Sequence, residues 1–466
     1  MPVLPADKAS FDVSVPVLVV GAGACGLTAA LSAADSGAEV LILERDPRPS
    51  GSTSLSAGLI AAAGTRLQRE HGVDDSPAIF ADDILRKTHG EVDRALVGAI
   101  TEASGPLIDW LQDRQGLDLH LVGGFLFPGH TQLRMHGPAS QTGADLEAML
   151  LAAAGREGVD VMASASVEDL YAEADGRVVA VGVVRPDGRR ELIGCEALIL
   201  ACGGYGGDRS LVARYIPEMA EAEYCGHASN TGDALRWGEG LGAEVLDLGS
   251  YQGHGSVPRP HAAPLTWAVI TLGGFQVNAE GRRFSDESLG YSEHAETILA
   301  QPGGFAWNIY DARCEEAAIP FADYKEMQRL GAIKEAASVE DLAAVTSLPP
   351  DALRATMAEA ARLAAGEGRD AFGRDFTKSP PLAPPYRTAK VTGALFHTQG
   401  GLAIDGDARV LRPDGSALPN LFAGGGAARG ISGPGASGYL AGNGLTTATV
   451  LGRIAGRSAA RLVAGR

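Results

Sequence analysis

The feature that most constrains this chain is a short apolar run followed by closely spaced glycines and a helix. Residues 15–20 read VPVLVV, the pattern of a strand that is buried on both faces. Residues 21–26 read GAGACG, and apolar side chains then recur at helical spacing. A second strand-like segment, residues 39–43 (EVLIL), ends at Glu44. This order predicts a parallel βαβ unit, and therefore an α/β fold.

Each glycine of the run has its own role in a turn that binds a dinucleotide. Gly21 permits the tight turn, Gly23 lets the backbone approach a pyrophosphate, and Gly26 lets the helix pack on the strand. The helix N-terminus adds unpaired N–H groups and the positive end of its dipole. Glu44 is placed to accept hydrogen bonds from a ribose. The sequence therefore predicts a dinucleotide site, although Glu44 alone does not separate NAD from FAD.

Further motifs separate the two cofactors. They occur in the same order as in a known family and cover nearly the whole chain: 51–58 (GSTSLSAG), 61–65 (AAAGT), 231–234 (TGDA), 284–287 (FSDE), 397–402 (HTQGGL), 420–426 (NLFAGGG) and 442–445 (GNGL). With these motifs the chain resembles the flavoprotein superfamily of fumarate reductases and succinate dehydrogenases. The resemblance implies a Rossmann-like FAD-binding domain in two pieces, 1–248 and 389–466, with an α+β cap domain, 249–388, inserted between them.

The resemblance also implies which residues contact FAD. The predicted contacts are Gly21, Gly23, Ala24, Cys25, Gly26, Glu44, Arg45, Ser52, Thr53, Ser56, Ala57, Gly58, Val167, Cys202, Gly203, Gly204, Gly425, Gly442, Asn443, Gly444 and Leu445. Segment 51–58 has no counterpart of the histidine that carries covalent flavin in succinate dehydrogenases, so we predict non-covalent FAD. Gly426 departs from the family, which usually has an acidic or amide residue there. The final helix is expected from about residue 445, with Asn443 and Gly444 at its start and its dipole facing the flavin.

Two histidines and two tyrosines are the candidates for the substrate end. His254 and His397 match the two histidines with which fumarate reductases bind a dicarboxylate. Tyr291 falls where those enzymes have a proton-delivering arginine, and Tyr439 lies near their substrate-clamping arginine, with a one-residue shift. A phenol cannot replace the bidentate hydrogen bonds of a guanidinium. The resemblance in this region is therefore closer to 3-ketosteroid Δ1-dehydrogenases and related ketone desaturases.

In those desaturases a tyrosine after an Asn/Asp-Glu pair removes a proton, and Tyr291 follows Asp286-Glu287 at a similar place. Their G-P-G-A loop, here 433–436, implies that the Gly435 N–H binds the ketone oxygen. Ile431 occupies the place of the tyrosine that assists this glycine. Tyr291 needs a lowered pKa to act as a base, so a neighbour such as His254, together with Tyr251, is expected to supply it.

Four further side chains are weaker candidates for this end. Arg134, His136 and Trp267 are candidates to line the cleft. Arg429 is expected either to balance a substrate carboxylate or to pair with a surface acid.

The predicted activity is an FAD-dependent α,β-dehydrogenation of a cyclic ketone. Tyr291 takes the α-proton while the β-hydride passes to flavin N5. The substrate is left open between a cyclohexanone-type ring, such as 4-oxocyclohexanecarboxylate, and a 3-ketosteroid. The alternatives are a fumarate-type enoate reductase and a non-catalytic flavoprotein. The electron acceptor is predicted to be external, because the chain has no haem or iron–sulfur motif.

Composition narrows the partners and the compartment. The formal net charge is −18, and lysines and arginines are not clustered, so nucleic acid and an anionic membrane are poor partners. The five cysteines form no C-x-x-C pair, and no apolar stretch is long enough to span a membrane. We predict a cytoplasmic enzyme for a small-molecule ketone, without a metal site; the oligomeric state is left open.

Overall fold

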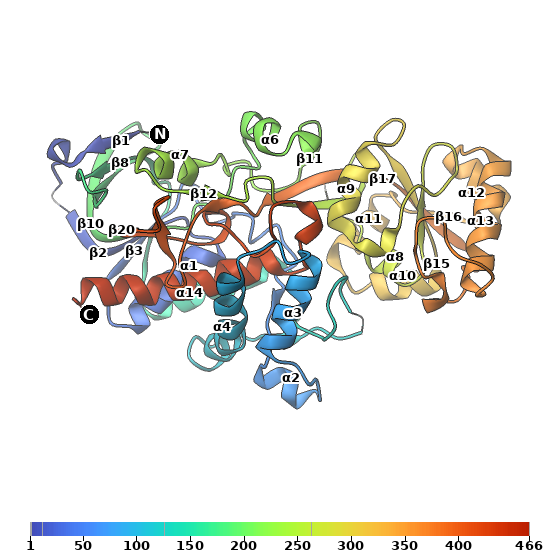
Figure 1. Ribbon diagram of the computed structural model, residues 1–466, viewed down its shortest axis with the longest axis horizontal. Helices are drawn as coiled ribbons and strands as arrows, with labels where there is room; N and C mark the ends of the chain where they lie inside the picture. Colours follow the sequence, from blue (N-terminus) through green and yellow to red (C-terminus); the bar gives the residue numbers. More distant parts are fainter. Residues whose placement is uncertain (1, 12, 125, 262, 466) are drawn as a thin grey trace.

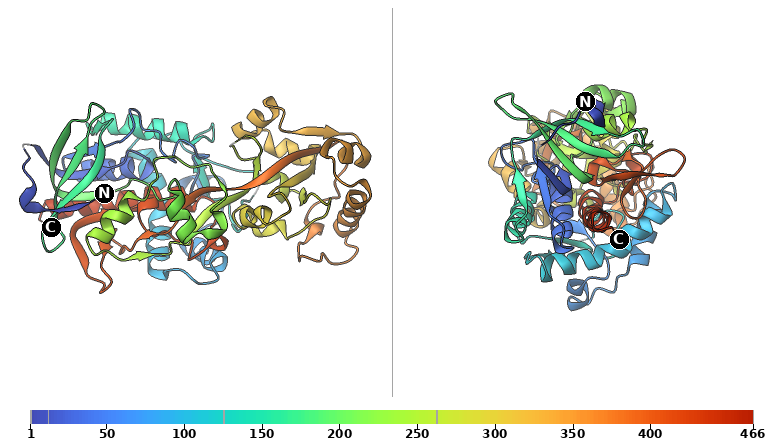
Figure 2. Two further views of the ribbon diagram at one scale, coloured as in Figure 1. Left: turned by 90° about the horizontal axis from the view of Figure 1, so that it is seen from above. Right: turned by 90° about the vertical axis from the view of Figure 1, so that its left-hand side faces the viewer.

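The computed structural model describes residues 2–11, 13–124, 126–261 and 263–465. The molecule is elongated, with a larger body and a smaller cap at one end (Figure 1). In the left view of Figure 2, both ends of the chain lie in the larger body, away from the cap. The cap therefore consists of residues from the middle of the chain, as the sequence predicts for an insertion. The boundaries at 248/249 and 388/389 remain a prediction.

The larger body is built on a mixed sheet of nine strands within the described residues. Its strands are β1 (Val3–Pro5), β2 (Val13–Val20), β3 (Val40–Leu43), β7 (Asp160–Met162), β8 (Ser166–Ala172), β9 (Val178–Val184), β10 (Arg190–Leu200), β19 (Arg409–Leu411) and β20 (Ala417–Ala423). They lie in the order β1-β8-β9-β10-β2-β3-β7, with β20 beside β10 and β19 beside β20. β2, β3, β7 and the C-terminal part of β10 run parallel, which confirms the predicted α/β class.

Two helices that contact this sheet pack side by side and run in the same direction, since Gly452 faces Cys25 and Gly456 faces Ala29. These are α1 (Ala24–Asp35), which follows β2, and the terminal helix α14 (Asn443–Val463), which packs along α1. A Cβ atom at Gly26 would lie 1.8 Å from the Gly21 carbonyl oxygen, so only glycine allows α1 to approach its own turn. A Cβ atom at Gly452 would lie 2.4 Å from the Cys25 carbonyl oxygen, so α14 also needs glycine at its contact with α1.

The cap is built on a second sheet, with one long strand at its centre. Its strands are β11 (Glu223–Tyr224), β13 (Tyr251–Pro258), β14 (Phe275–Val277), β15 (Ala306–Asp311), β16 (Lys334–Ala336) and β17 (Tyr386–Thr398). β17 pairs antiparallel with β13, β15 and β16. Figures 1 and 2 show β17 running out of the cap into the larger body. The strand spans the predicted junction at 388/389, so it connects the two parts directly.

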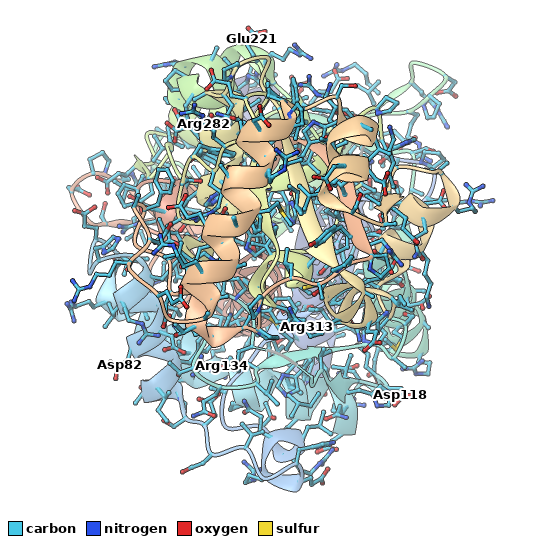
Figure 3. All side chains as sticks on the ribbon, turned by 90° about the vertical axis from the view of Figure 1, so that its right-hand side faces the viewer. Asp82, Asp118, Arg134, Glu221, Arg282 and Arg313 are labelled. Carbon is cyan, nitrogen blue, oxygen red and sulfur yellow. The ribbon has the colours of Figure 1, made fainter. Side chains whose placement is uncertain are left out.

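Helices surround the cap sheet. The cap helices are α8 (Ala268–Thr271), α9 (Tyr291–Leu299), α10 (Ala312–Ala318), α11 (Ala322–Arg329), α12 (Val339–Thr346) and α13 (Pro350–Ala364). Figure 3, seen from the cap end, labels Arg313 of α10 and Arg282, which lies in the connection after β14.

The remaining elements belong to the larger body and its connections. The helices are α2 (Arg66–Glu70), α3 (Pro77–Lys87), α4 (Arg94–Asp113), α5 (Gly143–Arg156), α6 (Arg209–Tyr215) and α7 (Asp233–Gly240). Two small sheets contain β4 (Ile60–Ala61), β5 (His120–Leu121) and β6 (Met135–Gly137), and β12 (Val245–Leu246) with β18 (Gly401–Leu402). Within the described ranges, no helix is both long and apolar enough to cross a membrane.

Candidate active site

One continuous cavity runs from the glycine turn after β2 to the cap helix α9. Most residues predicted from the sequence line it. On the cofactor side they are Gly21, Gly23, Ala24, Cys25, Glu44, Arg45, Ser52, Thr53, Ser56, Ala57, Val167, Cys202, Gly203, Gly204, Gly425, Gly442, Gly444 and Leu445. On the cap side they are His254, Tyr291, His397 and Tyr439. Of the predicted residues, Gly26, Gly58, Gly435 and Asn443 lie outside this lining.

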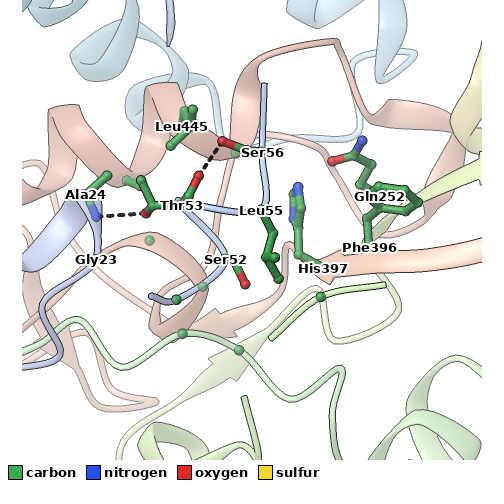
Figure 4. Close-up of a pocket in the computed structure, with 18 of the residues that line it drawn as sticks. Gly23, Ala24, Ser52, Thr53, Leu55, Ser56, Gln252, Phe396, His397 and Leu445 are labelled. Atoms are coloured by element: carbon green, nitrogen blue, oxygen red, sulfur yellow. Dashed lines mark hydrogen bonds between the residues drawn. The ribbon is translucent and has the colours of Figure 1, made fainter. Parts of the chain in front are cut away.

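Two side chains fix the backbone of the glycine turn by accepting hydrogen bonds from it. The Glu44 carboxylate accepts a hydrogen bond from the Ala22 N–H at 2.8 Å. The Thr53 hydroxyl accepts one from the Ala24 N–H at 2.9 Å, as Figure 4 shows. Gly23, the N-cap of α1, supplies no capping side chain, so this end of the helix is available to a ligand phosphate.

Several cavity residues were not found by the sequence analysis. Asn230 donates hydrogen bonds to the Ser52 hydroxyl at 2.8 Å and to the Tyr224 hydroxyl at 3.0 Å. Arg45 forms an ion pair with Asp233, and this pair ties the end of β3 to α7. Asp233 belongs to the family motif 231–234 and lies outside the cavity lining, so it acts on the cavity through Arg45. Asn230 carries no signal of its own, because its place depends on the tertiary fold.

The N-terminus of α14 forms the other wall of the cofactor region. Gly444 allows the His397 imidazole to approach, because a Cβ atom there would lie 2.9 Å from the ring. The Asn443 side chain is fully buried, and its Oδ1 atom has no hydrogen-bond partner within the described structure. A buried acceptor without a donor is costly, so this atom calls for a donor from a bound group. α14 begins two residues before the position expected from the sequence.

These features fit FAD, which has a pyrophosphate in the middle and a ring system with N–H groups at one end. The N-terminus of α1, where Gly23 has no side chain, suits the pyrophosphate. The N-terminus of α14 suits the ring system, because Gly442 and Gly444 line the cavity there and the unpartnered Asn443 oxygen lies between them in sequence. Glu44 and Arg45 lie at the ribose end of the same cavity.

A stacked pair of side chains occupies the cap end. The His254 imidazole lies on the Tyr291 ring, with centroids 4.9 Å apart, and the Trp267 ring closes the group at 6.1 Å from His254. Burial lowers the pKa of His254 to about 3, so the imidazole is neutral. Its Nδ1 atom accepts the Ser256 N–H at 3.1 Å. The ring hydrogen is therefore on Nε2, which is a donor.

The two tyrosines differ from the sequence expectation. The pKa of Tyr291 lies well above its usual value because the ring is buried and because its hydroxyl donates to that of Tyr439. Burial also raises the pKa of Tyr439, but the N–H groups of Gly444 and Gly442 and the contact with Tyr291 act in the opposite direction. The lowered pKa expected for Tyr291 is thus wrong for the protein alone. His254 contacts Tyr291 as expected, whereas Tyr251 lies outside the cavity lining.

Three other candidates, Arg134, His136 and Arg429, lie outside the cavity lining and are paired within the protein. Arg134 pairs with Asp75 and Asp83, and His136 lies 2.9 Å from the Thr65 hydroxyl. Arg429 pairs with two acids, at 2.6 Å from Asp247 and 3.2 Å from Asp93. Gly435 is half-buried in its loop, and a Cβ atom added there would have no neighbour within 4 Å, so the loop leaves open space beside it. Among the described residues, the lining of the cap end contains no lysine or arginine.

The comparisons with known proteins agree with this fold and this cavity. The model of the FAD binding domain family matches residues 16–445. A probable fumarate reductase, Ifc3, from Shewanella frigidimarina is 31% identical over 96% of this chain and 74% of its own length. A 4-oxocyclohexanecarboxylate 2-dehydrogenase from Sinomonas cyclohexanicum is 27% identical over 96% of this chain and 93% of its own. The crystal structure of a 3-ketosteroid-Δ4-(5α)-dehydrogenase from Rhodococcus jostii superposes with a TM-score of 0.80 at 23% identity, covering 99% of this chain and 100% of that one, and shows the shared fold.

The fold and the cavity define a dinucleotide-binding flavoprotein. The chain belongs to the FAD binding domain family. It is an FAD-dependent oxidoreductase of the fumarate reductase family, acting on CH–CH groups. The predicted superfamily, enzyme class and cofactor are therefore confirmed.

A buried acid on α5 gives a test of stability against pH. Burial raises the pKa of Glu147 from 4.5 to about 7, and its Oε1 atom has no partner within the described structure. A group with a raised folded-state pKa binds more protons when folded, so it lowers stability as the pH rises from about 4.5 to about 7. We expect Glu147→Gln to raise the free energy of unfolding by about 2 kcal/mol at pH 8 and to have little effect at pH 4.5. Urea titrations at both pH values measure this, with Glu102→Gln, an exposed helical glutamate, as the control. Equal effects at the two pH values would contradict the prediction.

Proposed function

We propose that this protein removes two hydrogens from adjacent carbons of a cyclic ketone and so forms an α,β-unsaturated ketone. The observation that supports this best is the cap end of the cavity, which among the described residues has aromatic rings, imidazoles and phenols but no guanidinium or ammonium group. A dicarboxylate would bury two charges there without a counter-charge, which is costly. A ketone brings no charge and needs only a hydrogen-bond donor.

The acid–base group of this proposal is the pair of tyrosines. Tyr291 donates its hydrogen toward Tyr439, and the Tyr439 oxygen lies near the N–H groups at the start of α14. The helix N-terminus favours negative charge on that oxygen. The relay starts when Tyr439 loses its own proton to solvent, which becomes more favourable as the pH rises. The Tyr439 phenolate then takes the hydroxyl proton of Tyr291 as Tyr291 takes the α-proton of the ketone. Each proton moves to an adjacent oxygen, so no charge is left on Tyr291.

His254 is the donor that we assign to the ketone oxygen. Its neutral ring carries the hydrogen on Nε2, and it lies in the cavity wall against Tyr291. A hydrogen bond to the carbonyl stabilises the negative charge that develops on the oxygen as the α-proton leaves. Gly435, assigned this role from the sequence, is outside the lining, and its role stays a prediction. FAD, when bound, supplies the acceptor for the hydride of the β-carbon.

The substrate that we favour is a single-ring ketone. The relative from Sinomonas cyclohexanicum, which is named for 4-oxocyclohexanecarboxylate, matches over nearly its whole length. Cyclohexanone is the same ring without the carboxylate group, and the lack of a cation at the cap end favours it. A 3-ketosteroid is the alternative, larger substrate, because a dehydrogenase of similar fold is named for that class of ketone.

The test is a screen of saturated ketones with the FAD-loaded enzyme. We expect cyclohexanone or 4-oxocyclohexanecarboxylate to bleach the flavin absorbance without oxygen and to sustain reduction of an artificial acceptor. A 3-ketosteroid tests the larger alternative. If no ketone bleaches the flavin, the desaturase proposal falls and a non-catalytic role is favoured.

A fumarate-type enoate reductase is the second candidate. His254 and His397 both line the cavity, and a relative at 31% identity is a probable fumarate reductase. We expect photoreduced enzyme, mixed anaerobically, to be reoxidised by 2-cyclohexenone and not by fumarate. Rapid reoxidation by fumarate alone would favour the reductase instead.

A further inference from the structure

A second cavity lies in the cap, next to the cap end of the first. It has a volume of about 460 Å³, within the range of about 300–1,000 Å³ typical of small-molecule sites. We call it the cap chamber. Its apolar wall is formed largely by six side chains: Phe275, Val339, Met357, Phe376, Leu382 and Tyr386. This wall suits an apolar ligand rather than a charged one.

The charged residues of the cap chamber are either paired or exposed. Arg374 and Glu287 are buried and form an ion pair at 3.0 Å, so the charge of each is balanced by the other. Arg354, Asp375 and Lys378 are exposed. The interior therefore remains apolar.

Trp267 lies in the wall of both the cap chamber and the cap end of the first cavity, which we call the ketone cavity. Together with Pro128 and Thr271, it lines both cavities. Its side chain is held by three rings, those of His254 at 6.1 Å, Tyr291 at 6.3 Å and His294 at 5.4 Å, measured between centroids. The residue is only 4% exposed. A side chain that is packed on this many neighbours cannot swing aside without losing those contacts.

We propose that the Trp267 indole limits the substrate to a single ring, because it closes the ketone cavity against the cap chamber. This inference rests on the proposed function and extends it to substrate size. A ring bound beside Tyr291 meets the indole where a second, fused ring would continue. Without the indole, the second ring enters the cap chamber and buries its apolar surface there, which is favourable.

The test compares cyclohexanone with trans-2-decalone, its two-ring analogue, in the FAD-loaded enzyme. In wild type we expect cyclohexanone to have the higher kcat/KM. In Trp267→Ala we expect the ratio of kcat/KM for trans-2-decalone to that for cyclohexanone to rise about tenfold or more. Trp267→Phe retains a ring at the partition and is expected to stay close to wild type. An unchanged ratio in a folded Trp267→Ala protein, or a wild type that already prefers trans-2-decalone, overturns the proposal.

A second substitution fills the chamber instead of opening it. Met357 lies in the wall of the cap chamber and not in that of the ketone cavity. Met357→Trp alone is expected to leave cyclohexanone turnover unchanged. Combined with Trp267→Ala, it is expected to abolish the gain for trans-2-decalone, and a gain that persists would count against the chamber. Trp267→Leu gives the same comparison if Trp267→Ala does not fold.

Calorimetric binding of both ketones separates this inference from the proposed function. If no variant turns over a ketone, yet Trp267→Ala alone gains affinity for trans-2-decalone, the desaturase proposal falls and the partition stands. If cyclohexanone is turned over but neither affinity nor turnover shifts in Trp267→Ala, the partition falls and the desaturase proposal stands.

Discussion

Tyr291→Phe is expected to lower kcat for a cyclic ketone by about 100-fold or more, with FAD still bound. General acid–base groups typically contribute about 10²–10⁴-fold to a rate, and the variant loses the oxygen that receives the α-proton. The ring itself remains, so its stacking on His254 at 4.9 Å is retained. The measurement is steady-state turnover together with the flavin absorbance of the purified variant.

The control is Tyr310→Phe. Tyr310 is also a buried cap tyrosine, and its hydroxyl lies 3.0 Å from that of Tyr324 rather than in the cavity. We expect this variant to keep its turnover. Full turnover in Tyr291→Phe would remove the hydroxyl from the mechanism.

The same assignment predicts a pH dependence. Because burial and the contact with Tyr439 raise the pKa of Tyr291, its hydroxyl keeps its proton through the neutral range. Ionisation of the tyrosine pair becomes more favourable as the pH rises, so kcat in wild type is expected to increase from pH 7 to pH 10. A profile that is flat over this range would contradict the use of a phenol as the base.

Arg134→Met is expected to lower the free energy of unfolding by about 3–5 kcal/mol, the cost of breaking a buried ion pair by removing one partner. The Arg134 side chain is 0% exposed and sits between two acids. Its Nε and Nη2 atoms donate to the Asp75 carboxylate at 2.7 and 2.9 Å, and it also forms an ion pair with Asp83. The substitution leaves these carboxylates buried with too few donors. Figure 3 labels Arg134 among the side chains seen from the cap end.

Arg86→Met is the matched control for this measurement. Arg86 also pairs with Asp83, but its side chain is 56% exposed, so its contribution is expected to be below about 1 kcal/mol. Urea titration of both variants measures the difference. Equal losses of stability would show that burial does not set the importance of these pairs. The loss of FAD on gel filtration is a second readout for Arg134→Met, because the neighbouring Met135 lines the cavity.

The cofactor end shows how much the sequence can reveal when a site is local. Gly21, Gly23 and Glu44 lie within one βαβ unit, and their roles follow from the geometry of that unit. Motif matches extended the prediction to most of the cavity lining. Asn230 was missed, because its contact with Ser52 joins segments that are far apart in the sequence.

The cap end of the cavity shows the opposite case. His254 lies on β13, Tyr291 begins α9, His397 lies on β17 and Tyr439 precedes α14. The motifs identified these residues one by one, and the fold brings them into one wall. The sequence also assigned Gly435 to this group, but its loop is held outside the lining.

The sequence by itself determined the superfamily, the cofactor and a set of residues most of which line the cavity, because each depends on motifs of neighbouring residues. Only the tertiary structure decided the charge and shape of the substrate end. It placed Arg134 and Arg429 in ion pairs away from the cavity, raised the pKa of Tyr291 by burial, and set Trp267 between two cavities. Burial and distance between remote segments are properties of the packed chain, and no local pattern of residues encodes them.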